Sequence, residues 1–335
     1  MKNKKSKYLI FTIIVLLVVA AAVIGIKEFA EKPPKLNICT FSNGTGYASD
    51  YPDDTVRTED RLYNYEYKNG IHTEEIYSRK AVYGSYHISP DGTQFYYTSN
   101  QSDTFGIWRL NIEKQTEEKV FDKPVNDIFF VGDTLYATGL SFKAENEIPI
   151  YYSADGDNWE LLSTIGEEKA DDLLVSDMAE YDGKLYAATA YALYSSEDNG
   201  KTWKTFFNQR EVVSNLMCMN GKMYFTSHEK GGFRVNDKGQ SFNMLDFEID
   251  GKSSREFWPM GSLVEAGDSL WAGTATEDMS ANSYAFVWNC KSERLQGYIK
   301  IRDSESLIGV IGEQIYLYSS LSGDIRVVEY EPLAY

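Results

Sequence analysis

The sequence predicts an all-β fold built from repeated four-stranded sheets, and three observations carry this prediction. The 335 residues include 25 Tyr, 17 Phe and 6 Trp but only 8 Pro, and such aromatic enrichment favours strands over helices. A tight glycine turn between two apolar runs recurs along the chain. A second kind of turn, which combines an aspartate, a glycine and an aromatic residue, recurs between the glycine turns. Regular recurrence of one unit indicates a repeat protein.

The glycine turns fall at residues 92, 132, 183, 221, 267 and 312, at spacings of 40, 51, 38, 46 and 45 residues. Asp182-Gly183 and Asn220-Gly221 predict type I′ hairpins, because both central residues of such a turn need a positive φ. Spacings in this range are typical of four-stranded blades. Residues 36–80 leave room for one more unit before the first turn. We therefore expect about seven units over residues 36–335, with six or eight as the alternatives.

The second kind of turn is clearest between Ser196 and Trp203. Asp198 would accept hydrogen bonds from nearby backbone N–H groups, Gly200 supplies a positive φ, and Trp203 returns a large ring to the core. The pattern S-x-D-x-G-x-T-W resembles the Asp-box, or BNR repeat, of β-propellers such as sialidases, sortilin-type receptors and photosystem assembly factors. Two weaker copies keep part of the pattern, namely Asp155 and Trp159 in one and Asp237, Gly239 and Phe242 in the other. We predict a structural role for all these residues.

Ser89-Pro-Asp-Gly92 also resembles a known repeat, that of TolB-like propellers, where it joins two strands of a blade. Together, the two resemblances imply a β-propeller of about seven four-stranded blades over residues 36–335. The two ends of the chain are expected to share one blade, because sharing removes exposed sheet edges. Leu36–Phe41 would then pair beside Asp324–Tyr330.

The first 27 residues predict a membrane anchor. A basic tail over residues 1–7 precedes an apolar run over residues 8–26. As a helix, this run would reach about 28 Å, close to the thickness of a bilayer core. Lysines before the run keep the N-terminus cytoplasmic, so a linker over residues 27–35 and the propeller are expected outside the cell membrane. A signal peptide cleaved after Ala22 is the alternative.

Several classes of function lack support in the sequence. The formal net charge is −17, whereas nucleic-acid binding needs a basic footprint. Three cysteines without C-x-x-C spacing offer no zinc or thioredoxin-like site, although a Cys39–Cys290 bridge stays open. Asp155-Gly-Asp157 lacks the ligand spacing of a calcium loop, and no glycine-rich phosphate loop occurs. The sequence thus offers no catalytic, cofactor or metal residue to name.

Candidate ligand-binding residues belong to one rim of the predicted propeller. Both kinds of turn fall on the same rim, which leaves the longer loops and the crossovers between blades on the other. Arg255, Phe257 and Trp258 occupy the longest crossover, and exposed Arg and Trp are typical interface anchors. The alternative is that Phe257 and Trp258 pack under their own crossover. Arg210 and His228 belong to neighbouring loops of the same rim.

The expected function is non-catalytic: binding or scaffolding of a protein, a peptide or a glycan. The alternative is a sialidase-like glycoside hydrolase, a class that grips a carboxylate with three arginines. Arg210, Arg255 and Arg302 would be the candidates here, yet the F/Y-R-I-P motif of that class does not occur. The three histidines, including His87, have no nucleophile-elbow motif to work with. Carboxylates and arginines converging at the central channel would favour the enzyme.

Overall fold

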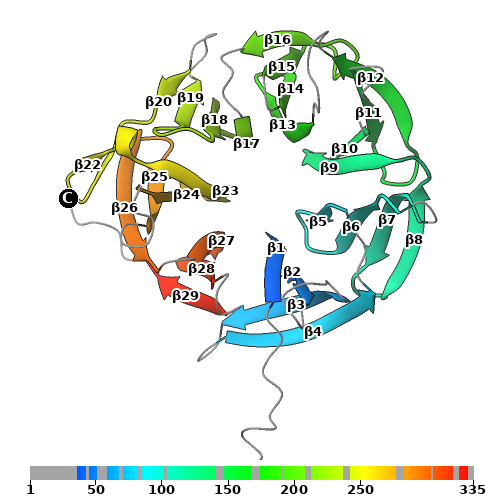
Figure 1. Cartoon of the computed structure of the whole chain (residues 1–335), viewed down its shortest axis with the longest axis horizontal. Helices are drawn as coiled ribbons and strands as arrows, with labels where there is room; N and C mark the ends of the chain where they lie inside the picture. The colour runs from blue at the N-terminus through cyan, green and yellow to red at the C-terminus, as the bar shows by residue number, and fades with distance from the viewer. Residues whose placement is uncertain are drawn as a thin grey trace, which may run out of the picture. The chain divides into compact units, whose positions relative to one another are not determined.

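The structure is a computed structural model, and its regular part begins at Leu36 (Figure 1). The residues that it describes are 36–42, 45–50, 59–67, 71–80, 84–101, 104–139, 147–166, 174–189, 192–207, 213–236, 242–276, 283–302, 305–319 and 324–330. The predicted tail, anchor and linker of residues 1–35 lie outside this set. Within the set, no helix is long and apolar enough to cross a membrane.

Six sheets of the described chain have four strands each, in the order in which the chain forms them. Their strands are β1 (Leu36–Ser42), β2 (Thr45–Asp50), β3 (Glu59–Tyr67) and β4 (Ile71–Lys80); β5 (Tyr86–Ile88), β6 (Gln94–Ser99), β7 (Gly106–Asn111) and β8 (Thr116–Phe121); β9 (Val125–Val131), β10 (Thr134–Gly139), β11 (Glu147–Ser153) and β12 (Glu160–Gly166); β13 (Val175–Tyr181), β14 (Lys184–Thr189), β15 (Leu193–Ser196) and β16 (Lys204–Phe207); β17 (Val213–Met219), β18 (Lys222–Ser227), β19 (Phe233–Asn236) and β20 (Asn243–Met244); and β23 (Trp258–Ala266), β24 (Ser269–Ala275), β25 (Ser283–Asn289) and β26 (Arg294–Ile301).

Two smaller sheets complete the described part. The last sheet has three strands, β27 (Glu305–Ile311), β28 (Gln314–Ser319) and β29 (Ile325–Glu329). A hairpin of β21 (Glu248–Ile249) and β22 (Lys252–Ser253) precedes the short 3-10 helix η1 (Ser254–Glu256), and both lie in the crossover between β20 and β23. Within the unit that starts at Leu36, the sheets surround a common centre, with the first strand of each sheet innermost (Figure 1).

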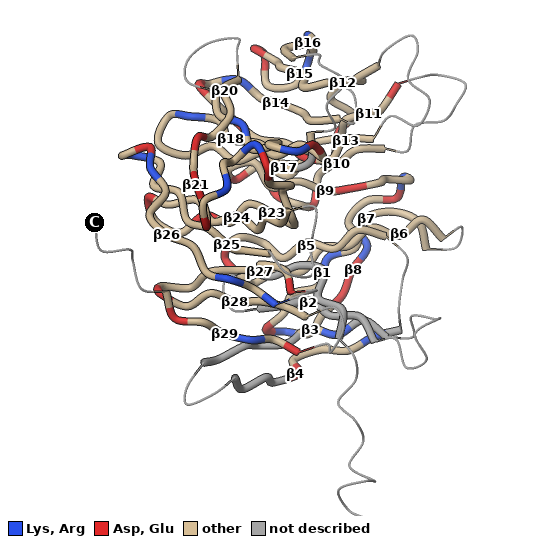
Figure 2. The backbone as a smooth tube through the Cα atoms, turned by 60° about the vertical axis from the view of Figure 1, so that its left-hand side comes forward, with Lys and Arg blue, Asp and Glu red and all other residues tan. Residues whose placement is uncertain are grey.

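Burial follows position within each sheet. The second strands, such as β10 and β14, are buried along nearly their whole length, because neighbouring sheets cover both of their faces. The fourth strands face solvent: β8 is exposed over its first four residues, and the positions of its charged residues are coloured along the backbone in Figure 2. Clusters of buried apolar residues fill the spaces between neighbouring sheets, for example between β9–β12 and β13–β16.

The glycine turns lie where the repeat predicted them, each between the first and second strands of a sheet. Asp182 and Gly183 have φ values of 50° and 70°, and Asn220 and Gly221 have 49° and 69°. These positive angles are those of a type I′ hairpin, so the turn prediction is confirmed. The Asp-box-like turns join third to fourth strands. Because paired strands are antiparallel, both kinds of turn lie on one rim, here called the turn rim.

The predicted sharing of one blade by the two chain ends is wrong. β1 pairs with β2 in the first sheet, and β29 pairs with β28 in the last. The physical reason is that β4 completes the first sheet from consecutive residues, so the fourth place is already filled when the chain returns. The two sheets instead contact each other through β1 with β27 and through β4 with β29. Cys290 is buried and free, so the Cys39–Cys290 bridge does not form.

Candidate functional site

The turn at Ser196–Trp203 uses its polar groups on itself. The Asp198 carboxylate accepts hydrogen bonds from Thr202 N at 2.8 Å, Thr202 Oγ1 at 2.7 Å and Ser196 Oγ at 2.7 Å. These bonds, led by those from Thr202 and Ser196, lower the pKa of Asp198 to about 2. Gly200 N donates to Ser196 Oγ at 2.7 Å. The carboxylate thus holds the turn together through bonds from both of its ends.

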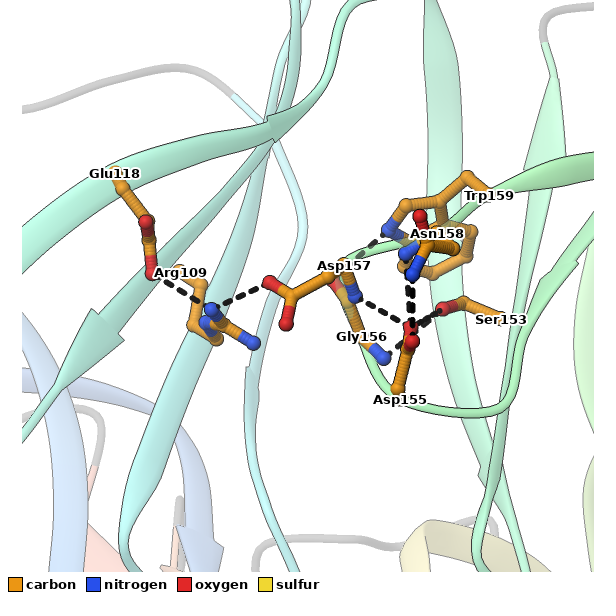
Figure 3. A network of polar contacts seen from close by, with 8 residues as sticks. All are labelled: Arg109, Glu118, Ser153, Asp155, Gly156, Asp157, Asn158 and Trp159. Carbon is orange, nitrogen blue, oxygen red and sulfur yellow. Dashed lines mark hydrogen bonds and ion pairs between the residues drawn. The ribbon is translucent and has the colours of Figure 1, made fainter.

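The turn at Ser153–Trp159 is built in the same way (Figure 3). Asp155 Oδ1 accepts from the backbone N–H groups of Asp157 and Asn158 at 2.9 and 2.8 Å, and these bonds hold the pKa of Asp155 well below its usual range. Trp159 Nε1 donates to the carbonyl of Gly156 at 3.1 Å. In the third copy, Asp237 and Gly239 lie outside the described residues. Phe242 packs edge-on against other phenylalanine rings.

The structure places His228, Arg255 and Trp258 on the rim opposite the turns. His228 is exposed in the loop between β18 and β19, Arg255 is exposed in η1, and Trp258 is half-buried at the start of β23. Gly231 N donates to the carbonyl of Phe257 at 2.7 Å, which ties the His228 loop to the crossover. Arg210 lies outside the described residues.

Phe257 has a different position from the one expected of an interface anchor. Its side chain is completely buried. Its ring stacks on Phe247 with a centroid separation of 6.0 Å and meets Tyr284 edge-on. Phe257 therefore supports the crossover from inside, as the alternative reading of the sequence proposed, and only Arg255 and Trp258 remain available for contact from this segment.

A second group of polar residues, here called the inner cluster, comprises His87, Asp127 and Asp177 on the innermost strands β5, β9 and β13. His87 Nε2 lies 2.6 Å from Asp127 Oδ1. Asp177 accepts from its own neighbour, Met178 N, at 2.8 Å and from Leu216 N of the next sheet at 2.7 Å. Burial, reinforced by the nearby charge of Asp127, raises the pKa of Asp177 to about 7.

The sequence reasoning missed this cluster, although a signal for it exists. His87 and Asp127 each lie five residues before a turn glycine, at positions 92 and 132, and Asp177 lies six residues before Gly183. Aligning the repeats on their glycines would have placed the three side chains on neighbouring innermost strands. Among the described residues, no group of His, Cys, Asp or Glu has the arrangement of a metal site.

A sialidase-like site, the alternative function, would need three converging arginines, of which Arg210 lies outside the described residues and Arg255 is exposed in η1. Arg302 directly follows β26, with its side chain 75% exposed and its Nε 4.0 Å from Glu305 Oε1. Glu305 instead accepts two hydrogen bonds from Arg326, from Nε at 2.8 Å and from Nη2 at 2.6 Å. This bidentate pair joins β27 to β29 and has a structural explanation.

Comparison with known proteins bears on the fold alone. No protein-family model matches the chain, and no curated protein matches its sequence. Among solved structures, the β-propeller domain of the trilobed protease from Pyrococcus furiosus is 12% identical with a TM-score of 0.53, over 87% of this chain and 97% of that one. The chain is a β-propeller.

Two further structures resemble this propeller. Apo AztD from Citrobacter koseri is 10% identical with a TM-score of 0.52, over 90% of this chain and 85% of that chain. A prolyl endopeptidase is 10% identical with a TM-score of 0.58, and the match covers 94% of this chain but only 54% of the enzyme. The Pyrococcus domain is described as having an open velcro topology. In the described part of this propeller, the first and last sheets form separately.

Proposed function

We propose that this propeller is a non-catalytic binding or scaffolding module that recognises a protein or peptide on the rim opposite the turns. The supporting observation is the fixed crossover that carries Arg255 and Trp258. Burial of Phe257 and the 2.7 Å bond from Gly231 N hold its backbone in place. A backbone that is already fixed loses little conformational entropy on binding, which favours the side chains it carries as interface anchors.

The competing function, a glycoside hydrolase, draws its support from Asp177. A carboxyl group with a pKa of about 7 has the value that a general acid needs at neutral pH. Both of its oxygens, however, accept backbone N–H groups, from Met178 and Leu216. A catalytic acid must offer its proton to the substrate, so this hydrogen bonding favours binding over catalysis. Turnover of a sialoside by the purified protein would reverse this conclusion.

Three finer inferences accompany the proposal. The three-stranded sheet β27–β29 would be the seventh blade of the ring. The turns at Ser153–Trp159 and Ser196–Trp203 would be Asp-boxes, as their sequence pattern and hydrogen bonds both suggest. Residues 8–26 would hold the propeller at the outer face of the cell membrane. For the binding rim itself, a glycan is the alternative to a protein or peptide ligand.

The binding proposal is tested with the full-length protein in detergent. Proteins that co-purify with the wild type are identified, and their affinity for purified Trp258→Ala is measured by calorimetry. Truncating an anchoring Trp should cost at least about 2 kcal/mol, or roughly 30-fold in Kd. Lys114→Ala, an exposed lysine in the β7–β8 turn, is the matched control and should leave Kd unchanged. Retained affinity in Trp258→Ala together with loss in Lys114→Ala would move the binding surface to the turn rim.

The anchor has a test of its own. N-terminal sequencing of protein extracted from membranes should find the segment of residues 8–26 intact. A mature chain that begins after Ala22 would show cleavage and would make the propeller a secreted protein.

A further inference from the structure

A pocket of about 350 Å³ opens on the turn rim, between the sheets β9–β12 and β13–β16. This volume is at the lower end of the range of small-molecule sites, about 300–1,000 Å³. The pocket is distinct from the rim assigned above to a macromolecular partner. Its wall includes Tyr136, Tyr152, Leu162, Glu180, Asn199 and Lys201.

One wall of the pocket is the turn Ser196–Trp203, and it is fixed to the neighbouring sheet. Ser163 Oγ, on β12, donates to the carbonyl of Gly200, and Trp203 Nε1 donates to Ser163 Oγ at 3.0 Å. A Cβ on Gly200 would lie only 2.7 Å from Leu162 Cδ2, so the turn lies directly against β12. Asn199 and Lys201, on either side of this glycine, are therefore held at the edge of the pocket.

The opposite wall is aromatic. Tyr136 and Tyr152 are directly opposed residues on the paired strands β10 and β11, so their rings lie on the same face of the sheet. Tyr136 is 8% exposed and Tyr152 is half-buried. Burial, and then the charge of Glu180, raises the pKa of Tyr136, and both residues line the pocket.

Two opposite charges at the pocket have no partner among the residues that the structure describes. Glu180 and Lys201 are both exposed, and neither makes an ion pair or a side-chain hydrogen bond within that set. The nearby Lys184 and Glu197, which do not line the pocket, pair with each other at 2.8 Å. The pocket thus offers one anionic and one cationic group beside an apolar, aromatic wall.

We propose that this pocket binds a free α-amino acid with a large apolar or aromatic side chain. The ammonium group of the ligand would pair with Glu180 and its carboxylate with Lys201. Its side chain would pack against Tyr136, Tyr152 and Leu162. Such a ligand supplies a partner for each of the two charges and packs against the aromatic wall at once, which a ligand with a single charge does not.

Calorimetry on the full-length protein tests the proposal with L-phenylalanine and L-tryptophan as probes. N-acetylphenylalanine lacks the ammonium charge and phenethylamine lacks the carboxylate, and each should bind the wild type about tenfold more weakly than phenylalanine. Glu180→Gln should abolish the preference over N-acetylphenylalanine only. Lys201→Met should abolish the preference over phenethylamine only. This crossed pattern would assign each charge to its residue.

Two controls keep the result interpretable. Lys184→Met removes a lysine that is already paired outside the pocket and should leave the affinity for phenylalanine unchanged. Trp258→Ala should also retain it, which separates this site from the partner-binding rim. The proposal is overturned if neither amino acid binds the wild type at about 10 mM. It is equally overturned if the wild type binds phenylalanine and N-acetylphenylalanine with the same Kd.

Discussion

The turn rim and the inner cluster hold carboxylates in similar ways but with opposite results. Asp198 accepts a backbone N–H from Thr202 at 2.8 Å, and Asp177 accepts two backbone N–H groups, from Met178 at 2.8 Å and Leu216 at 2.7 Å. The pKa of Asp198 is nevertheless lowered to about 2, whereas that of Asp177 is raised to about 7. Hydrogen-bond donors stabilise the charged form in both, so the difference lies in the surroundings: Asp177 lies deep among the innermost strands, where desolvation dominates, whereas Asp198 lies at the rim.

The comparison assigns different roles to the two regions. At the rim, water and the turn donors together keep Asp198 ionised across the physiological range, so the turn geometry is insensitive to pH. On the innermost strands, loss of water outweighs two backbone donors, and the charge of Asp177 changes close to neutrality. A response of this propeller to pH near neutrality is therefore expected at its centre, whereas its turns should respond only in strong acid.

The largest expected effect comes from the aromatic residue of the rim turn. Trp203 packs against the apolar cluster between two sheets and donates to Ser163 Oγ at 3.0 Å. Trp203→Ala should lower the free energy of unfolding by about 3 kcal/mol, the low end for a Trp truncation, because the ring is only half-buried. Trp203→Phe, which keeps an aromatic ring, should cost about 1 kcal/mol. Urea unfolding measures both, and an unchanged midpoint for Trp203→Ala would show that the turn does not depend on its ring.

The next effect concerns the inner cluster. Because the folded-state pKa of Asp177 is about 7, above the ordinary value of about 4, the folded protein binds this proton more tightly than the unfolded chain. The stability that Asp177 contributes in its protonated form is present below about pH 4 and is lost as the pH rises to about 7. Asp177→Asn lacks this titration, so its stability relative to wild type should increase from pH 5 to pH 8. Parallel stability curves for the two proteins would contradict the raised pKa.

The smallest effect should have the opposite sign. The folded-state pKa of Asp198 is about 2, so its stabilisation is present above about pH 4 and is lost as the pH falls towards 2. Asp198→Ala should therefore lower Tm at pH 6 and differ little from wild type near pH 2. Asp155→Ala, in the equivalent turn, should behave in the same way. A Tm difference that is larger in acid than at pH 6 would place Asp198 with the inner cluster.

The rim turns could be predicted from the sequence because their contacts are local. The partners of Asp198 lie within four residues of it, at Ser196 and Thr202, so a short pattern contains the whole structure. The glycine hairpins are equally local. The repeat spacing then fixed the order of strands and the rim on which each turn lies.

The inner cluster and the buried crossover depend on distant contacts, which no short pattern contains. His87 and Asp127 lie 40 residues apart and meet only because two sheets stand side by side. Phe257 is buried because Phe247 and Tyr284 converge on it from separate elements. The sequence of Arg255–Trp258 is equally compatible with an exposed loop, so hydrophobic content alone could not decide its position.

The separate construction of the first and last sheets has a consequence for how such a chain can change over evolutionary time. Each sheet of the ring is made from consecutive residues, and among the described strands none belongs to two sheets. Duplication or deletion of one genetic repeat at either end would therefore add or remove a whole sheet and leave no orphaned strand behind. A ring closed by a shared strand has no such freedom, because its two ends must be inherited together.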